Sequence, residues 1–362
     1  MKLPSGLAPR KVIPVLITLG IFLIVAIAAS LFGSSLVDRI TTVMFVNVIM
    51  VLGLQIFMGN SGLLSFAHVG FMGIGAYASA LFSLPPDQKL MSLPDLYTPF
   101  QDLQLGFLPA VFAAAAVAAI FAAIVGFPLM RLADTAAAIA SFALLVIVHV
   151  VLSQWTAMTN GPRTLFGLLK YTDMWTAAIW AFIIIVVAFV FKESSLGMKL
   201  RASRDNVHAA NAVGIDVIKT RWIAFVISAF ICGMAGAMWA HFITSFQPGA
   251  FYMSMTFIVL TMLIVGGPQT VSGTALGVLI ITVVSESLRQ MENTLGMNAN
   301  FPFDTVGMTE ILLAIVLILV LAFRPGGLVE KTELGAGWAK RRGRLRRQTQ
   351  PETTDESLAG TE

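Results

Sequence analysis

Hydrophobic and polar positions along the chain separate into long apolar runs joined by short polar segments. The hydrocarbon core of a bilayer is about 30 Å thick, and an α-helix crosses it with about 20 predominantly apolar residues. We predict ten such spans, at about residues 12–32, 40–58, 62–83, 107–130, 134–155, 174–191, 222–242, 252–266, 273–289 and 307–323. The predicted fold class is therefore all-α, a polytopic integral membrane protein with about ten transmembrane helices.

The first apolar run follows Lys2, Arg10 and Lys11, and this arrangement is also typical of a secretory signal peptide. The run is about 20 residues long, whereas the apolar core of a signal peptide is about 7 to 15 residues long. We therefore interpret it as an uncleaved first helix, and we expect no separate soluble domain in the chain.

Composition indicates the same class. The 362 residues are 57% hydrophobic and 12% charged, with a mean hydropathy of +0.86, whereas about 25% of the residues of an average soluble protein are charged. A formal net charge of +4 would suggest a nucleic-acid partner in a soluble protein, but the bias of basic residues towards cytoplasmic loops explains it here. Cys232 is the single cysteine, which excludes an intramolecular disulfide, and we expect it to be a small buried side chain.

The distribution of basic residues predicts the orientation. With the N-terminus inside and ten spans, the outer segments hold only five of the 23 lysines and arginines, namely Arg39, Lys89, Arg163, Lys170 and Arg289. Cytoplasmic loops of membrane proteins carry the excess of Lys and Arg. We therefore predict a multi-pass protein of a bacterial inner (plasma) membrane with both termini in the cytoplasm.

The longest polar stretch between two apolar runs is the loop at about residues 193–221, which is rich in Lys and Arg. The topology places it in the cytoplasm. We interpret it as a helix against which a soluble partner docks, and the alternative is a solvated helix at the membrane interface.

Two further segments lie outside the spans. Residues 84–106 form an outer loop that is long enough to cover the outer mouth or to meet a partner, and the alternative is an ordinary solvated loop. Residues 1–331 form the predicted transmembrane domain, and residues 332–362 a cytoplasmic, disordered tail. The tail changes from basic to acidic, and its cluster at residues 340–347 is expected to contact anionic lipids.

Glycine-rich breaks interrupt two of the apolar helices, at residues 59–68 and 266–273. Breaks at corresponding places in two halves indicate an internal repeat and a transport pathway, but small residues also let helices pack closely without any transport role. Both interpretations stay open. The candidate pathway residues are Gly59, Asn60, Gly62, Ser65, His68, Gly266, Gly267 and Gln269.

Catalytic chemistry has no support in the sequence. The chain contains no phosphate-binding loop of the G-x-x-x-x-G-K-[ST] type, no H-E-x-x-H zinc motif and no G-x-S-x-G turn. Its four histidines are scattered, so no metal site is predicted. No acidic residue lies near the middle of a span, which argues against transport coupled to an ion gradient. We expect the chain not to be an enzyme and its driving energy to come from another subunit.

The chain resembles the membrane permeases of the ABC importers for branched-chain amino acids, specifically the longer of the two permeases in such systems. The resemblance covers about residues 40–328. It is carried by GLLSFAHVGFMGIGAYASALF from Gly62, by RDNVHAANAVGIDVIKTRWIAF from Arg204, by the Gly266-Gly267 turn and by RPGGL from Arg324. It implies a second permease subunit, two cytosolic ATPases that bind ATP and Mg, and a periplasmic solute-binding protein.

The resemblance also implies a coupling helix within the 193–221 loop. Such helices carry an Ala-Ala-x-x-x-Gly core, here Ala209, Ala210 and Gly214, with His208 where an acidic residue usually stands. We expect the alanines to enter a groove of the ATPase and Gly214 to end the helix in a left-handed conformation. Arg201, Arg204 and Asp205 would fix the orientation through charge pairs at the rim.

Some positions depart from the family pattern. Gln269 stands where another glycine is usual, Pro268 precedes it, and Ala133 and Ala136 replace a glycine and an aromatic residue. These changes affect the prediction of the substrate more than that of the importer's subunit organisation, because related systems import urea, short amides, aromatic acids or other amino acids. The alternatives to an importer permease are an ion-coupled secondary transporter, a channel and an exporter permease.

Overall fold

The computed structural model describes residues 9–296, 307–324, 326–329, 333 and 334. These residues form fifteen α-helices and one 3-10 helix. Their bounds are α1 Pro9–Phe32, α2 Ser35–Ser61, α3 His68–Ser83, α4 Pro86–Ser92, α5 Thr98–Gln101, α6 Phe107–Leu129, α7 Asp134–Gln154, α8 Thr156–Thr159, α9 Met174–Glu193, α10 Ser195–Asp205, α11 Val207–Ala212, α12 Val217–Ile243, η1 Pro248–Phe251, α13 Met253–Gly266, α14 Val271–Gly296 and α15 Met308–Phe323.

The all-α, multi-pass class is confirmed. Eight helical segments are long and apolar enough to cross a membrane, and each of them matches one of the ten predicted spans. The other two predicted spans correspond to α3 and α15, which have 16 residues each. Within the described residues the only β pairing is an isolated antiparallel bridge between Leu165 and Phe246.

Several boundaries differ from the predicted ones: α2 and α12 each begin five residues earlier than predicted, and larger differences occur at the start of α3 and the end of α14. The third span was predicted to begin at residue 62, but α2 extends to Ser61 and ends because Gly62 adopts a left-handed backbone with φ 75°. Residues 63–67 then form no α-helix, and α3 begins at His68. At the other end of the chain α14 continues to Gly296, beyond the predicted residue 289.

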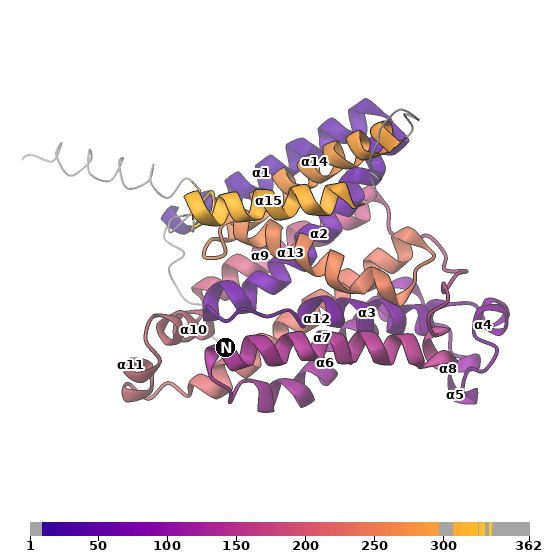
Figure 1. The fold of residues 1–362 in the computed structure, drawn as a ribbon, viewed down its shortest axis with the longest axis horizontal. Helices are drawn as coiled ribbons and strands as arrows, with labels where there is room; N and C mark the ends of the chain where they lie inside the picture. The colour runs from indigo at the N-terminus through magenta and orange to yellow at the C-terminus, as the bar shows by residue number, and fades with distance from the viewer. Residues whose placement is uncertain (1–8, 297–306, 325, 330–332, 335–362) are drawn as a thin grey trace, which may run out of the picture.

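The bundle has two distinct ends. Figure 1 shows α10 and α11 together at one end and the short helices α4, α5 and α8 at the other, with the long helices between them. Helices α2 and α12 form the centre, because most residues of their apolar stretches are buried. Helices α1 and α7 lie at the periphery, because most residues of theirs are not buried.

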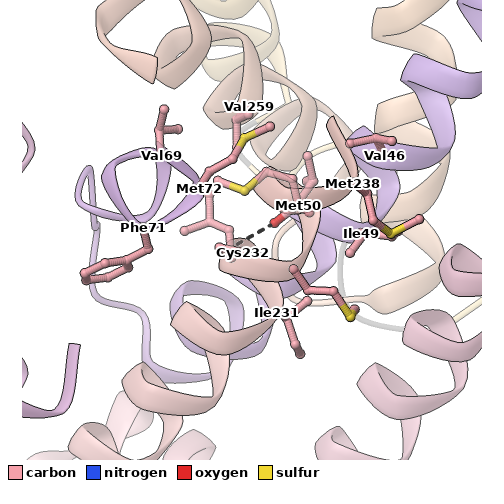
Figure 2. Packing of buried hydrophobic residues seen from close by; sticks show 14 of the residues in the cluster. Val46, Ile49, Met50, Val69, Phe71, Met72, Ile231, Cys232, Met238 and Val259 are labelled. Carbon is pink, nitrogen blue, oxygen red and sulfur yellow. Dashed lines mark hydrogen bonds between the residues drawn. The ribbon is translucent and has the colours of Figure 1, made fainter. Parts of the chain in front are cut away.

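The centre is filled by apolar side chains from α2, α3, α12 and α13. Figure 2 shows Val46, Ile49 and Met50 of α2 beside Cys232 and Met238 of α12. Cys232 is fully buried, as expected, and its thiol donates a weak hydrogen bond to the Met50 carbonyl oxygen at 3.7 Å.

Glycines let α12 approach α3 backbone to backbone. A Cβ atom added to Gly75 would lie 2.1 Å from the Gly233 carbonyl oxygen, and one added to Gly236 would lie 1.9 Å from the Met72 carbonyl oxygen. Small residues allow this close helix packing in membranes. The glycine-rich sequences of these two helices are therefore explained by packing.

Gly236→Ala is expected to destabilise the protein by about 3 kcal/mol or more, because overpacking against a backbone atom cannot be relieved by a rotamer change. The matched control is Gly20→Ala in α1, where an added Cβ has no neighbour within 4 Å. Thermal unfolding of the detergent-purified variants measures the difference. Equal melting temperatures for the two variants would contradict this packing.

The loop at residues 84–106 is folded onto itself. The amino group of Lys89 is buried and donates hydrogen bonds to the carbonyl oxygens of Phe100 and Leu103. Burial lowers the pKa of Lys89, and the charge of the Asp102 carboxylate opposes that shift. The loop is thus an ordered cap at the end of the bundle opposite α10 and α11, although Leu90 and Met91 remain exposed on it.

Candidate functional site

Local side-chain caps define the helices of the 193–221 loop. Ser194 accepts a hydrogen bond from the Gly197 amide at the start of α10, Asn206 accepts one from the Ala209 amide at the start of α11, and Asp216 accepts one from the Lys219 amide at the start of α12. Short polar side chains are the preferred N-caps because they satisfy amides that have no partner in the helix. The loop therefore forms two short helices in place of the single helix that was expected.

The end of α11 is a Schellman motif. Gly214 has φ 82°, its amide donates to the Asn211 carbonyl oxygen at 3.0 Å, and the Ile215 amide donates to the Ala210 carbonyl oxygen at 3.0 Å. This is the pattern in which a left-handed residue, usually glycine, ends a helix. The left-handed conformation expected at Gly214 is confirmed.

The two alanines of the predicted core face opposite environments. Ala210 is 3% exposed and packs inside this chain, whereas Ala209 and Ala212 are exposed, as is His208. The expectation that Ala210 presents itself to a partner groove is wrong for this conformation, because a six-residue helix resting on its own chain must turn one side inwards.

Val213 is the residue of this loop that the sequence reasoning missed. It is 75% exposed at the tip of the loop, beside Ala212. A single exposed apolar side chain is common on protein surfaces, but Val213 lies next to the exposed Ala212 and follows the exposed Ala209 on the same short helix, so these residues form a small apolar surface. The signal was a valine directly before the glycine that ends the helix, within a polar loop.

Both arginines expected to form rim charge pairs instead bond to this chain's own backbone. Arg204 Nη1 donates to the Gly59 carbonyl oxygen at 3.0 Å, and Arg201 Nη2 donates to the Lys192 carbonyl oxygen at 2.8 Å. Asp205 is exposed, and its carboxylate lies 3.4 Å from the Arg204 guanidinium. The arginines therefore hold α10 against the bundle.

The two glycine-rich breaks lie against each other. A Cβ atom added to Gly59 near the end of α2 would lie 2.0 Å from the Pro268 carbonyl oxygen in the turn between α13 and α14. The Gln55 amide donates to the same oxygen at 3.3 Å. The aliphatic part of Arg204 covers Gly62, where an added Cβ would lie 2.6 Å from Arg204 Cγ.

These contacts join three segments that are far apart in sequence, namely α10, the end of α2 and the turn at residues 266–270. We call this cluster the loop junction. Arg204 joins α10 to α2, and α2 contacts the turn, so the three segments form one continuous set of contacts.

The glycines of the second break are also explained by close approach. A Cβ atom added to Gly266 would lie 2.3 Å from the Gly273 carbonyl oxygen. One added to Gly267, where φ is 109°, would lie 2.5 Å from the Val329 carbonyl oxygen. The packing interpretation therefore accounts for the pattern of small residues.

Most of the candidate pathway residues are not on the surface of this chain. Asn60, Ser65 and His68 are buried, as are Gly59, Gly266 and Gly267. His68 is fully buried, bonds to the Ser65 hydroxyl at 2.9 Å and stacks on Phe57 with ring centroids 5.6 Å apart. A pathway along the surface of this conformation could therefore reach only Gly62 and Gln269, which are exposed.

Within the described ranges, no group of three or more His, Cys, Asp or Glu side chains is arranged to hold a metal ion. The arrangement therefore fastens an exposed loop to the rest of the chain, through Arg204 to the first helix break and through Arg201 to the end of α9.

Comparison with known proteins identifies the protein family to which the chain belongs. The family model described as "Branched-chain amino acid transport system / permease component" matches residues 35–321. The chain belongs to that family. The match includes the 193–221 loop and both glycine-rich breaks.

Similar proteins include the "High-affinity branched-chain amino acid transport system permease protein LivM" of Escherichia coli strain K12, which is 25% identical over 91% of this chain and 80% of the relative. A "Probable branched-chain amino acid transport permease protein LivM" of Methanocaldococcus jannaschii is 29% identical over 42% of this chain and 46% of the relative. The "Nucleoside ABC transporter permease protein NupC" of Lactococcus lactis is 24% identical over 52% of this chain and 62% of the relative. No solved structure matches the chain significantly.

The protein is therefore a membrane permease subunit of an ABC importer. The helical bundle with eight long apolar helices agrees with that assignment.

Proposed function

We propose that this permease forms half of the translocation pathway of an ATP-driven importer for branched-chain amino acids or a related small polar solute. The family match over residues 35–321 is the observation that carries the proposal. The permease lies in the bacterial inner membrane with both termini in the cytoplasm. It hydrolyses nothing itself.

The partners follow from the same proposal. A periplasmic binding protein delivers the solute to the end of the bundle that carries α4, α5 and α8, and a second permease completes the pathway. Two cytosolic ATPases bind ATP and Mg, and one of them docks on α11 of this chain. The exposed Ala209, Ala212 and Val213 support this docking, because together they form a small apolar surface that a groove can enclose.

The test is uptake by the reconstituted complex of both permeases, the ATPases and the binding protein in proteoliposomes. We expect uptake of radiolabelled leucine that requires internal ATP and external binding protein, with isoleucine and valine competing. Uptake driven by a proton or sodium gradient without ATP would contradict the importer assignment.

A competition panel tests the substrate class separately. Urea, a short amide, an aromatic acid and a nucleoside represent the other candidates, and the nucleoside is included because of the similarity to a nucleoside permease. If one of these compounds is taken up and leucine is not, the importer assignment stands and the amino-acid substrate is wrong.

A further inference from the structure

Glu333, which lies ten residues beyond the end of α15, is bound at the start of α14. Its carboxylate accepts hydrogen bonds from the amides of Val271 and Ser272 at 3.0 Å each, and from the Ser272 hydroxyl. A carboxylate is favourable there because it satisfies the first amides of the helix and the positive end of the helix dipole. Glu333 was predicted to lie in a disordered tail, and the structure gives it and Leu334 defined positions, with the Leu334 amide donating to Ser272 at 3.1 Å.

The same carboxylate is paired with Lys192 in the last turn of α9. The Lys192 side chain is 8% exposed and its ammonium group also donates to the Gln269 carbonyl oxygen at 2.8 Å. Charge-assisted hydrogen bonds of this kind are stronger than neutral ones. Lys192 and Glu333 together thus hold the turn between α13 and α14 against the end of α9.

The end of α9 is also where α10 is fastened. The Lys192 carbonyl oxygen accepts the hydrogen bond from Arg201, and a Cβ added to Gly197 would lie 2.3 Å from the Phe191 carbonyl oxygen. One residue, Lys192, therefore binds α10 through its backbone and the α13–α14 turn through its side chain.

This link is unlike the other caps of the same region. Ser194, Asn206 and Asp216 each cap a helix from a position three residues away, whereas Glu333 caps α14 from a distance of about sixty residues. The intervening segment also contacts the turn, since the Leu328 and Val329 amides donate to the Val265 and Gly266 carbonyl oxygens at 2.9 and 3.2 Å. A local Ser, Asp or Asn would satisfy the amides equally well, so capping alone does not explain a carboxylate bound to a lysine of α9.

We propose that Glu333 is a positioning residue for energy coupling. Its ion pair with Lys192 makes the α13–α14 turn follow the movement of α10, because Lys192 also binds α10. The link complements the loop junction, in which Arg204 connects α10 with α2. The inference rests on the proposed function, because it needs an ATPase to move α10.

The experiment compares transport with ATP hydrolysis in the reconstituted complex. We expect Glu333→Gln and Lys192→Met each to lower leucine uptake about tenfold or more while ATP hydrolysis falls by less than about twofold. The double variant is expected to be no worse than the single variants, because groups in one network are not additive. A purely structural role would lower the amount of complex and leave the uptake per ATP hydrolysed unchanged.

A pair of truncations keeps the test decisive if the substitutions hamper assembly. Ending the chain after Leu334 retains Glu333 and is expected to preserve uptake per ATP, whereas ending it after Lys331 removes Glu333 and is expected to lower it as Glu333→Gln does. Equal coupling in the two truncations, or unchanged coupling in Glu333→Gln, would overturn the inference. Absence of uptake by the wild-type complex would instead contradict the proposed function.

Discussion

Val213→Glu is expected to abolish ATP-driven uptake while the permease still inserts, folds and pairs with the second permease. Val213 is 75% exposed and an added Cβ at the neighbouring Gly214 meets nothing within 4 Å, so the charge disturbs nothing in this chain. In an enclosed groove it would be unpaired and desolvated. The few residues that dominate an interface contribute about 2 kcal/mol or more each, and disruption at such a position corresponds to a loss of about thirtyfold in ATPase affinity. Co-purification of the ATPases and leucine uptake measure both effects.

The matched control is Leu90→Glu, which introduces the same charge at an exposed apolar position in the loop at the opposite end of the bundle. That variant is expected to retain its ATPases. If Val213→Glu binds the ATPases normally, the docking role of α11 is wrong.

Ala210→Glu is expected to behave differently from Val213→Glu. Because Ala210 is buried within the chain, a glutamate there has no room and displaces α11 itself. We therefore expect a lower melting temperature of the isolated permease as well as loss of uptake, whereas Val213→Glu leaves the melting temperature unchanged. Thermal unfolding in detergent separates the two causes, and equal melting temperatures would place Ala210 on the docking surface after all.

Arg204→Met is expected to lower uptake about tenfold without loss of ATPase binding. The substitution keeps an aliphatic side chain over Gly62 but removes the hydrogen bond to the Gly59 carbonyl oxygen. A hydrogen bond from a charged group contributes about 1.5 to 3 kcal/mol, and this one joins α10 to α2. The expected phenotype is therefore ATP hydrolysis with little transport.

Lys199→Met is the matched control, since it removes the same charge from the same helix at an exposed position. It is expected to transport as the wild type does. A similar loss of transport in both variants would mean that the net charge of α10, and not the bond to Gly59, determines coupling.

Much of the fold could be predicted from the sequence, because its causes are local. Apolar runs of about 20 residues identify membrane helices by length alone, and all ten predicted spans correspond to helices. The left-handed end at Gly214 follows from the low cost of that conformation for glycine. The helices predicted within residues 193–221 are present as α10 and α11, and their coupling role stays a prediction.

The contacts within the site could not be predicted, because they join residues far apart in sequence. Arg204 lies about 145 residues after Gly59, and Glu333 about 60 after Ser272, and no local pattern indicates such pairs. The inward direction of Ala210 was also hidden, since a helix of six residues is too short to show a periodic apolar face. His68 appeared to be a polar pathway residue, but Ser65 and the surrounding aromatic rings accommodate it in the interior.

The most direct test of the account is crosslinking between the tip of the 193–221 loop and the ATPase. Cys232 is the single native cysteine and is buried, so Cys232→Ala gives a background without thiols. We predict that Val213→Cys in this background crosslinks to the ATPase with a short bifunctional reagent, and that Leu90→Cys does not. Crosslinking from Leu90→Cys with none from Val213→Cys would contradict the claim that the ATPase binds and drives this permease through α11.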